Sequence, residues 1–360
     1  MAKKTRGAAV IGTGFGFITH VRALEEAGIQ VEAIVGRDPE KTQDRARRAS
    51  IPHALTSVDE ALALPNVDLV TIATPPHTHA QIAVKACEAG KHVMCEKPFA
   101  ANLSEAERML EAAEKSGIVH ALGTEFRFQA TQAVATRALS QGLIGDPRMA
   151  SFMLLMPVLA GTAAEVPDWW SDAGEGGGWL GAYASHVIDQ TRTMLGEWTG
   201  LSASLNTLSG QGWSADDSFT IHFRTAEGCS GILQSSSAAY GAPFGTVRIS
   251  GRDGTIEIVG EKVILSDASG TRELEVPEEL ANGAPKPTPD MEVLTTTYDT
   301  FHMGGGDVDP FAKLFRSMVD TIDGRVPSGP ALATFADGVA LQRIMDAIRR
   351  SNELESWEVL

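Results

Sequence analysis

The tripeptide Glu96-Lys97-Pro98 places a lysine at the end of the run 91–95, which contains a predicted parallel strand. In open α/β sheets, ligands bind beyond the carboxyl ends of the strands, so this lysine stands where chemistry is done. An amine held in a dry pocket near another cation loses its proton more readily, which suits a general acid or base. The alternative is a solvated lysine before a turn proline, and the tripeptide by itself favours that alternative.

Strand-like and helix-like segments alternate through the first 125 residues. Ser104 and Glu107 form an S-x-x-E capping box that predicts a helix start. Alternation of this kind implies right-handed crossovers and a parallel sheet, so residues 1–125 are predicted to form a doubly wound α/β domain of the Rossmann type. The predicted strands are 8–11, 31–35, 67–73, 92–94 and 118–122, and the predicted helices are 18–27, 39–49, 58–62, 78–89 and 104–116.

After about residue 125 the pattern changes to β-like runs joined by hairpin-type turns such as 225–228 and 251–254. A helix at 132–140 precedes these runs, and helices at 309–322 and 331–351 close the chain. Residues 126–360 are therefore predicted to form an α+β domain with a large, mostly antiparallel open sheet. The predicted strands are 148–156, 218–223, 229–236, 246–250, 255–259 and 263–265, and the proline-rich segment 277–289 is predicted to be a loop.

The segment Gly12-Thr13-Gly14-Phe15-Gly16 follows the first predicted strand and opens the first helix. Glycines at such a turn allow positive φ and let the backbone approach a pyrophosphate at the helix N-terminus, which predicts a dinucleotide site made by Gly12, Gly14, Phe15 and Gly16. In the usual G-x-G-x-x-G pattern the third glycine would fall at position 17, which is Phe17 here. Gly16 is expected to supply part of the room between helix and strand.

The residue at the end of the second predicted strand indicates whether the cofactor is NAD or NADP. A carboxylate at this position accepts a hydrogen bond from the ribose 2′-OH of NAD and repels the 2′-phosphate of NADP. Position 36 is glycine, followed by Arg37 and, one helical turn on, Lys41. The nearest acid, Asp38, is expected to open the next helix in an Asp-Pro start. The sequence thus favours NADP(H) as the cofactor, with NAD(H) as the alternative.

A proline-stiffened loop, 73–79, ends the strand next to the one that carries Lys97. We expect Thr74 and Pro75 to lie against a cofactor ribose and His79 to reach a cofactor hydroxyl. The alternative, that His77 and His79 only begin a helix, stays open.

The charge of the chain excludes two classes of partner. Its 30 Lys and Arg against 46 Asp and Glu give a net charge of −16 and a pI of about 5.0, which argues against binding nucleic acid or anionic membranes. No apolar stretch reaches the ~20 residues of a membrane span, and residues 1–6 lead into no secretory segment. The three cysteines form no C-x-x-C pair, so neither a disulfide framework nor a metal site is predicted, and we expect a cytoplasmic protein.

Taken together, these features resemble the Gfo/Idh/MocA oxidoreductases over essentially the whole chain. The segments that carry the resemblance are 12–16, 73–79, 95–99, 125–128 and 176–189. The resemblance implies that Lys97 is the catalytic lysine, that Glu96 contacts the cofactor ribose, and that His186 binds substrate or transfers a proton. It also implies a second domain that binds substrate and joins the chain into a homodimer or homotetramer through its sheet.

The chain departs from the family pattern after its run of glycines. The usual G-G-G-x-L-x-D-x-G-x-H would place aspartate at 182 and glycine at 184, and both are alanine here. The carboxylate that normally works beside the lysine and histidine is therefore absent. Asp189 is a nearby acid on the same helix face and is also commonly a buried structural residue, while Tyr183 is a substitute hydroxyl donor or a packing residue.

The resemblance implies hydride transfer between a nicotinamide and a hydroxyl-bearing carbon. A small-molecule substrate is expected, a cyclic polyol or sugar derivative first and an alicyclic alcohol second. Two alternatives remain, an NAD-dependent glycoside hydrolase that acts by transient oxidation and a non-catalytic, cofactor-sensing regulatory protein. The expected substrate contacts are Arg127, Trp169, Trp179, Tyr183 and His186, with core packing as the alternative for the tryptophans.

Overall fold

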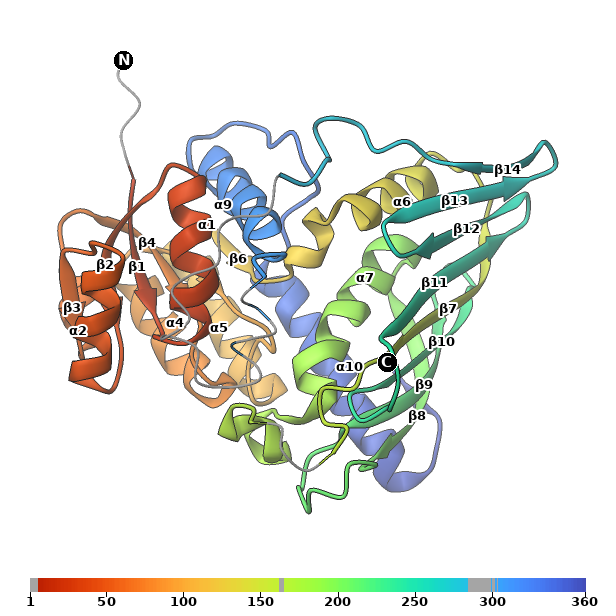
Figure 1. The fold of residues 1–360 in the computed structure, drawn as a ribbon, viewed down its shortest axis with the longest axis horizontal. Helices are drawn as coiled ribbons and strands as arrows, with labels where there is room; N and C mark the ends of the chain where they lie inside the picture. Colours follow the sequence, from red (N-terminus) through yellow and green to blue (C-terminus); the bar gives the residue numbers. More distant parts are fainter. Residues whose placement is uncertain (1–5, 162–164, 284–298, 300–301, 303) are drawn as a thin grey trace. The chain divides into compact units, whose positions relative to one another are not determined.

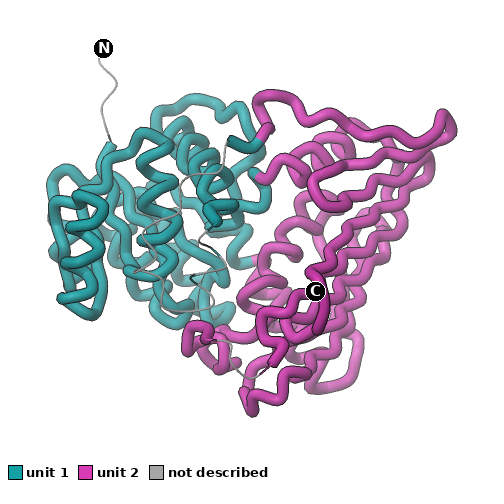
Figure 2. Tube along the Cα trace, viewed as in Figure 1, with its two compact units in different colours: residues 1–128, 282–339 teal, residues 129–281, 340–360 magenta. Residues whose placement is uncertain are grey.

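The computed structural model describes residues 6–161, 165–283, 299, 302 and 304–360 (Figure 1). The chain forms two compact units, which are coloured separately in Figure 2. One comprises residues 1–128 and 282–339, and the other comprises residues 129–281 and 340–360. The sequence-based division, at 125/126, assigned 282–339 to the second domain, whereas most of the described residues of that segment pack with the first.

The first unit is built on a six-stranded parallel sheet with the strand order β3-β2-β1-β4-β5-β6. All five residues of β1 are buried, as expected for a parallel strand that is covered by helices on both faces. This confirms the predicted Rossmann sheet, with one short strand, β3, added to it. The strands are β1 (Gly7–Ile11), β2 (Gln30–Val35), β3 (His53–Leu55), β4 (Val67–Ile72), β5 (His92–Cys95) and β6 (His120–Leu122).

Several helices of this unit begin at polar caps. Asp38 accepts hydrogen bonds from the Glu40 and Lys41 N–H groups at the start of α2 (Pro39–Arg48), as the Asp-Pro pattern predicts. At α5 (Leu103–Ser116) the cap is Asn102, which accepts from the Glu105 N–H, so the predicted cap at Ser104 is wrong by two residues. The other elements are π-helix η1 (Gly16–His20), which continues into α1 (Val21–Glu26), α3 (Val58–Leu62), η2 (Pro76–Thr78), α4 (His79–Glu88) and η3 (Glu125–Phe128).

Helix α9 (Val308–Ile322) explains why the late part of the chain returns to the first unit. Its apolar face is buried in one hydrophobic cluster with α1, and α9 lies beside α1 in Figure 1. Phe311 and Phe315 are completely buried there, together with Leu24 of α1. Burying such side chains stabilises the unit by about 1.5–3 kcal/mol each, which holds α9 against the Rossmann fold.

The second unit is built on a nine-stranded sheet with the order β14-β13-β12-β11-β7-β10-β9-β8-β15. All neighbouring strands are antiparallel except β7 and β10, so the predicted mostly antiparallel sheet is confirmed. The strands are β7 (Pro147–Leu155), β8 (Trp198–Asn206), β9 (Ser218–Thr225), β10 (Ser230–Ser236), β11 (Phe244–Gly251), β12 (Gly254–Val259), β13 (Lys262–Asp267), β14 (Gly270–Glu273) and β15 (Glu358–Val359).

Helices cover one face of this second sheet, where α6 contacts β12 and β13 (Figure 1). The longest helix, α10, runs from the first unit into the second. In the described part of the chain no helix is both long and apolar enough to cross a membrane. The helices are α6 (Ala130–Ser140), α7 (Ser185–Leu195) and α10 (Phe335–Leu354), with short helical turns η4 (Asp168–Ser171), η5 (Ala173–Glu175) and η6 (Leu180–Ala184).

Candidate active site

The glycine loop after β1 has the geometry of a dinucleotide cradle. Gly12 has φ of +128°, and a Cβ atom there would overlap the Ala73 carbonyl oxygen at the end of β4. Its N–H donates to Val35 O at 2.9 Å, which ties the loop to β2. Gly14, unlike Gly12, has open space beside it, because a Cβ atom there would meet nothing within 4 Å. The loop therefore fits a pyrophosphate, with open space over Gly14 at the beginning of a helix.

The structure explains how the loop functions with Phe17 in place of a third glycine. A Cβ atom on Gly16 would lie 2.9 Å from Val10 Cγ1 and 3.3 Å from Ala73 Cβ, so Gly16 is the residue that permits close helix–strand packing. The helix opens with the π-turn η1, which starts at Gly16. Phe17 is buried, and the guanidinium carbon of Arg45 lies 5.1 Å from its ring centroid.

The end of β2 has no room for a side chain at the position where NAD-binding domains often carry an acid. A Cβ atom on Gly36 would collide with side-chain atoms of Thr13 and Thr42. Close packing thus accounts for the glycine. The site that selects between ribose and phosphate must be formed by residues that follow.

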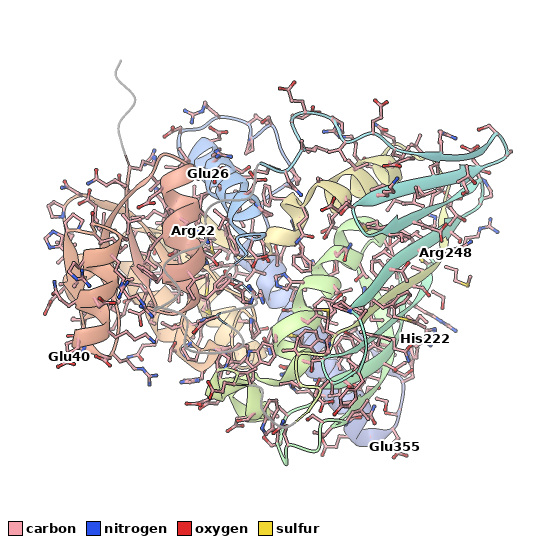
Figure 3. The ribbon with its side chains drawn as sticks, viewed as in Figure 1. Arg22, Glu26, Glu40, His222, Arg248 and Glu355 are labelled. Carbon is pink, nitrogen blue, oxygen red and sulfur yellow. The ribbon has the colours of Figure 1, made fainter. Side chains whose placement is uncertain are left out.

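Arg37 and Lys41, which follow Gly36, are both exposed. Neither forms a salt bridge with any residue that the structure describes. The intervening Asp38 uses Oδ1 for both of its cap hydrogen bonds at the start of α2, where Glu40 is labelled in Figure 3. This edge therefore carries two exposed cations, a carboxylate that caps the helix, and the exposed acid Glu40 in the first turn of α2.

His79 holds the loop that follows β4 in place. It is 1% exposed, and its Nε2 and Nδ1 atoms lie 2.7 Å and 3.2 Å from the carbonyl oxygens of Thr74 and Phe99. Burial lowers the pKa of this imidazole. The expectation that His79 reaches a cofactor hydroxyl is corrected, since both nitrogens face backbone oxygens inside the unit.

Thr74 and Pro75 remain at the surface of the same loop, half-buried. The Thr74 hydroxyl lies 2.6 Å from the Thr78 hydroxyl, which donates to Pro75 O at 2.7 Å. These bonds rigidify the turn. Contact of Thr74 and Pro75 with a cofactor stays a prediction.

Glu96 and Lys97 follow β5 at the carboxyl edge of the sheet, and they differ in exposure. Glu96 is 5% exposed, and its Oε1 lies 2.9 Å from Nε2 of His20, a completely buried residue at the end of η1. Its Oε2 accepts from the Lys97 N–H at 3.2 Å. Lys97 is half-buried, and its peptide bond to Pro98 is cis. The Glu96 carboxylate is therefore fixed from both sides, directly before the predicted catalytic lysine.

The chain that leaves β6 passes directly over Glu96. Gly123 donates its N–H to Cys95 O at 2.7 Å, and a Cβ atom on Gly123 would lie 2.7 Å from Glu96 Oε1. Two residues later Glu125 is 4% exposed. Burial, and next the negative charge of Asp307, raise the pKa of the Glu125 carboxyl group well above its usual value, whereas the charge of Lys97 acts in the opposite direction.

Asp307 reaches this region from the start of α9. Its Oδ2 lies 2.7 Å from Nδ1 of His302, whose ring makes an edge contact with Phe15 of the glycine loop at 5.0 Å. Phe15 makes a second edge contact, at 5.3 Å, with His20. No local sequence pattern assigns a site role to His20, Glu125 or Asp307, because the positions that meet here lie far apart in the chain.

Arg127 anchors the turn η3 that carries Glu125. Its guanidinium lies 3.3 Å from the Asp337 carboxylate and donates to Ala331 O at 3.2 Å. Only 8% of the residue is exposed. These contacts give Arg127 a structural role within the first unit, and its predicted contact with substrate remains a prediction.

In the second unit, the glycines that precede η6 permit close contact between backbones. A Cβ atom on Gly177 would overlap Trp169 O, and one on Gly178, where φ is +85°, would overlap the Asp216 carboxylate. Asp216 accepts from the Leu180 N–H at 3.0 Å, and burial raises the pKa of its carboxyl group to about 7. Asp216 is thus the cap of this turn, which the sequence pattern did not predict.

The aromatic residues near this turn pack against one another. Trp179 is buried, stacks on Tyr183 at 5.1 Å, and donates its indole N–H to Ser235 Oγ at 2.7 Å. The ring centroid of Trp170 lies 5.8 Å from that of Trp179 and 6.1 Å from that of the half-buried Trp169. The packing alternative therefore describes Trp179 well, and a substrate contact by Trp169 stays a prediction.

His186 and its neighbours lie on η6 and α7. His186 is 4% exposed and Asp189 is 1% exposed, while Ala182 is buried in the π-turn η6. π-Turns within helices are frequently found at functional sites. Burial raises the pKa of the Tyr183 hydroxyl, which keeps it protonated. Among the described residues, no group of three or more His, Cys, Asp or Glu could hold a metal ion.

Two family models match the chain. The model described as oxidoreductase family, NAD-binding Rossmann fold, matches residues 6–124, and the GFO/IDH/MocA C-terminal domain matches residues 133–262. Levoglucosan dehydrogenase from Pseudarthrobacter phenanthrenivorans is 29% identical over 369 residues, which cover 91% of this chain and 88% of that protein. D-Apiose dehydrogenase from Paraburkholderia graminis is 26% identical over 281 residues, which cover 75% and 72% of the two chains.

The solved structures agree with the sequence comparisons. A structure of levoglucosan dehydrogenase in complex with NADH and levoglucosan matches this chain with a TM-score of 0.82 and 26% identity. The match covers 99% of both chains. Similarity of fold therefore extends through both units.

Proposed function

Because the chain belongs to the Gfo/Idh/MocA oxidoreductases, NAD-dependent enzymes that act on sugar or polyol hydroxyls, we propose that Lys97 and His186 manage the hydroxyl proton of its substrate. The substrate is a cyclic polyol, a sugar derivative or an alicyclic alcohol. The observation that carries the proposal is the fixed Glu96, held by His20, directly before Lys97 at the carboxyl edge of the Rossmann sheet.

The nicotinamide, when bound, supplies the hydride chemistry. The residues of this chain then have two tasks, to orient the substrate and to hold one proton. In the oxidative direction, Lys97 Nζ accepts the hydroxyl proton as the carbonyl forms, and in the reductive direction it returns that proton. A positioned group of this kind contributes roughly 10²–10⁴-fold to the rate. His186 is the second polar group of the proposal, as a residue that binds substrate or transfers a proton.

Glu96 serves as the ribose contact in this proposal. A carboxylate that is already fixed by His20 and by the Lys97 N–H has little conformational entropy to lose on accepting a ribose hydroxyl. The space over Gly14 accommodates the pyrophosphate. Titration of the cofactor-free protein with NADPH and NADH, followed by fluorescence, tests this part directly.

For cofactor preference we favour NADP(H) over NAD(H). The support is the absence of an acid at Gly36 and the presence of exposed Arg37 and Lys41, since a guanidinium binds a 2′-phosphate with two parallel hydrogen bonds. The double variant Arg37→Ala/Lys41→Ala should lose roughly 10–100-fold in NADPH affinity and little in NADH affinity. Equal losses for both cofactors, or tighter NADH binding by the native protein, would overturn the preference.

Substrate class is tested with a panel of alcohols monitored at the nicotinamide absorbance. The relatives named above act on an anhydrosugar and on an aldose, so levoglucosan, apiose, inositols and alicyclic diols form the first panel. Turnover of at least one polyol or sugar with NADP⁺ or NAD⁺ is the expected result. Failure of the whole panel in both reaction directions would contradict the proposed substrate class.

We also propose that the open face of the second sheet joins the chain into a homodimer or homotetramer. The face away from α6 carries exposed apolar side chains on adjacent strands, with Met149 66%, Phe244 51% and Val259 53% exposed. Arg248, labelled in Figure 3, lies on the same face in an ion pair with Glu257. Light scattering after size exclusion should give the mass of two or four chains, and a monomer at micromolar concentration would refute this assembly.

A further inference from the structure

Lys97 is half-buried, but the two residues that follow it are buried in the first unit. Of these, Phe99 is 1% exposed. The carbonyl oxygen of Phe99 lies 3.2 Å from Nδ1 of His79, which ties this segment to the loop after β4. Only Pro98 separates Phe99 from Lys97, and its ring restricts φ, so a displacement of Phe99 passes to the backbone of the lysine.

The ring of Phe99 packs against the start of α10, where Gly338 leaves space for it. A Cβ atom on Gly338 would lie 2.5 Å from Phe99 Cδ1, 2.6 Å from Cγ and 2.8 Å from Cε1. These distances are shorter than carbon–carbon contact allows, so the ring or the helix would have to move. Glycine is a poorer helix former than alanine, and φ of Gly338 is not positive, so close packing with Phe99 accounts for this glycine.

Contacts within the first unit hold the start of α10 against β6. Phe335 is completely buried, and its ring centroid lies 4.7 Å from that of Phe99. The Phe335 N–H donates to Nδ1 of His120 at 3.1 Å, and the Leu122 N–H donates to Ala333 O at 2.9 Å. The start of the helix therefore resists movement, so an added methyl group would displace the ring of Phe99.

The backbone on the other side of Lys97 is fixed separately. The Lys97 N–H donates to Glu96 Oε2 at 3.2 Å, and the Glu96 N–H donates to Ile72 O at 2.9 Å. Lys97 thus stands between two anchored residues, Glu96 and Phe99. Misplacing a reacting group by about 1 Å can cost roughly 10²-fold in rate, so both anchors bear on its chemistry.

We propose that Phe99 is a positioning residue for Lys97, and that Gly338 gives the ring of Phe99 its place against the start of α10. The inference rests on the proposed function, because it assumes that Lys97 handles the substrate proton. Phe99 touches neither substrate nor cofactor in this proposal. Its buried ring sets the position of the Lys97 backbone, and with it the position of the amine.

Gly338→Ala adds one methyl group against the ring of Phe99. Alanine is the better helix former, so a helix without this contact would tolerate the change. We expect kcat on the best substrate of the alcohol panel to fall at least tenfold. Kd for NADPH and NADH should stay within threefold of native, because Glu96 keeps its contact with His20. Native kcat in a folded Gly338→Ala protein would overturn the proposal.

Gly329→Ala is the matched control for the added methyl group. Its Cβ atom would have its nearest neighbours, Phe128 Cε1 and Ser317 Oγ, at 3.8 Å, which is ordinary van der Waals contact. This variant should keep native kcat and native cofactor affinity. A loss of kcat equal to that of Gly338→Ala would show that the ring of Phe99 is not the cause, and would refute the proposal.

Phe99→Leu tests for rescue. Leucine is smaller than phenylalanine and lacks the rigid ring, so it can make room for the methyl group that Gly338→Ala adds. The double variant should therefore have a kcat at least threefold above that of Gly338→Ala. Phe99→Leu alone leaves the space underfilled and should lower kcat about threefold with unchanged cofactor Kd, which decides the matter if Gly338→Ala does not fold. A double variant no faster than Gly338→Ala, or native kcat in Phe99→Leu, would contradict the proposal.

Hydrogen exchange reports the state of the Lys97 segment without any substrate. In Gly338→Ala the amides of Glu96 and Lys97 should exchange about tenfold faster, and in the double variant they should return toward the native rate. The amides of β2, in the same unit, are the reference and should be unchanged. Equal acceleration in β2, or unchanged exchange at Glu96 and Lys97, would refute a positioning role. If exchange changes as expected but the native protein oxidises no alcohol, the proposed function fails and the placement of Lys97 by Phe99 stands.

Discussion

Glycines 12 and 14 are two residues apart and should respond to the same substitution in opposite ways. At Gly12 an added Cβ atom would overlap the Ala73 carbonyl oxygen, and φ of +128° is strained for any other residue. At Gly14 the same atom meets nothing within 4 Å. Gly12→Ala should therefore damage the fold, whereas Gly14→Ala should damage only cofactor binding.

The magnitudes follow from these two environments. The backbone strain at position 12 costs roughly 1–3 kcal/mol, and the overlap with Ala73 adds to it. For Gly14→Ala the folded protein gains no clash, so stability should stay within about 1 kcal/mol of the native value. A methyl group in the path of the pyrophosphate costs about 1–3 kcal/mol of binding, as overpacking does in a protein interior, which corresponds to roughly 5- to 150-fold in Kd.

The assay pairs thermal unfolding with fluorescence titration of NADPH and NADH on the same two variants. Gly12→Ala should lower Tm by several degrees, and Gly14→Ala should leave Tm near the native value while raising Kd for both cofactors. Native affinity in Gly14→Ala would show that the pyrophosphate does not pass over this glycine. A native Tm in Gly12→Ala would contradict the close approach to Ala73.

Further predictions concern the second unit and the Glu96 support. The pKa of the Asp216 carboxyl group is raised to about 7, so the folded state binds the carboxyl proton more tightly than the unfolded state does. The free energy of unfolding should therefore fall by a few kcal/mol between pH 4 and pH 7. Asp216→Asn keeps an acceptor for the Leu180 N–H and should flatten this pH dependence in denaturant titrations. An identical slope in both proteins would refute this origin. Gly123→Ala should displace the Glu96 carboxylate, weaken its hydrogen bond to His20, and raise the Kd of the cofactor about tenfold. An unaltered Kd would show that cofactor binding does not depend on the position of Glu96.

Local patterns predicted most elements of the fold. Apolar runs bounded by turns predicted five of the strands in the first sheet, and the Asp38-Pro39 pair marked the start of α2. The cap of α5 was misassigned because Asn102-x-x-Glu105 and Ser104-x-x-Glu107 both fit the same pattern. Strand β8 was not predicted, since its sequence of small and polar residues alternates only weakly.

The parts of the candidate site that were missed depend on contacts between distant segments. His20 is 76 residues from Glu96, and nothing near either residue indicates that they form a buried pair. Asp307 acts on Glu125 only because α9 returns to the first unit and packs on α1. His79 was misread for the same reason, because its second partner, the carbonyl of Phe99, is twenty residues away.

Turnover by Lys97→Met tests the central claim most directly. The native protein and the variant are compared in kcat on the best substrate of the alcohol panel, with NADPH and NADH affinity measured on the same preparations. We expect kcat to fall by about 10²-fold or more, as loss of a positioned acid/base group should cause, with cofactor affinity nearly unchanged. Near-native turnover in a folded Lys97→Met protein would contradict the assignment of the substrate proton to this lysine.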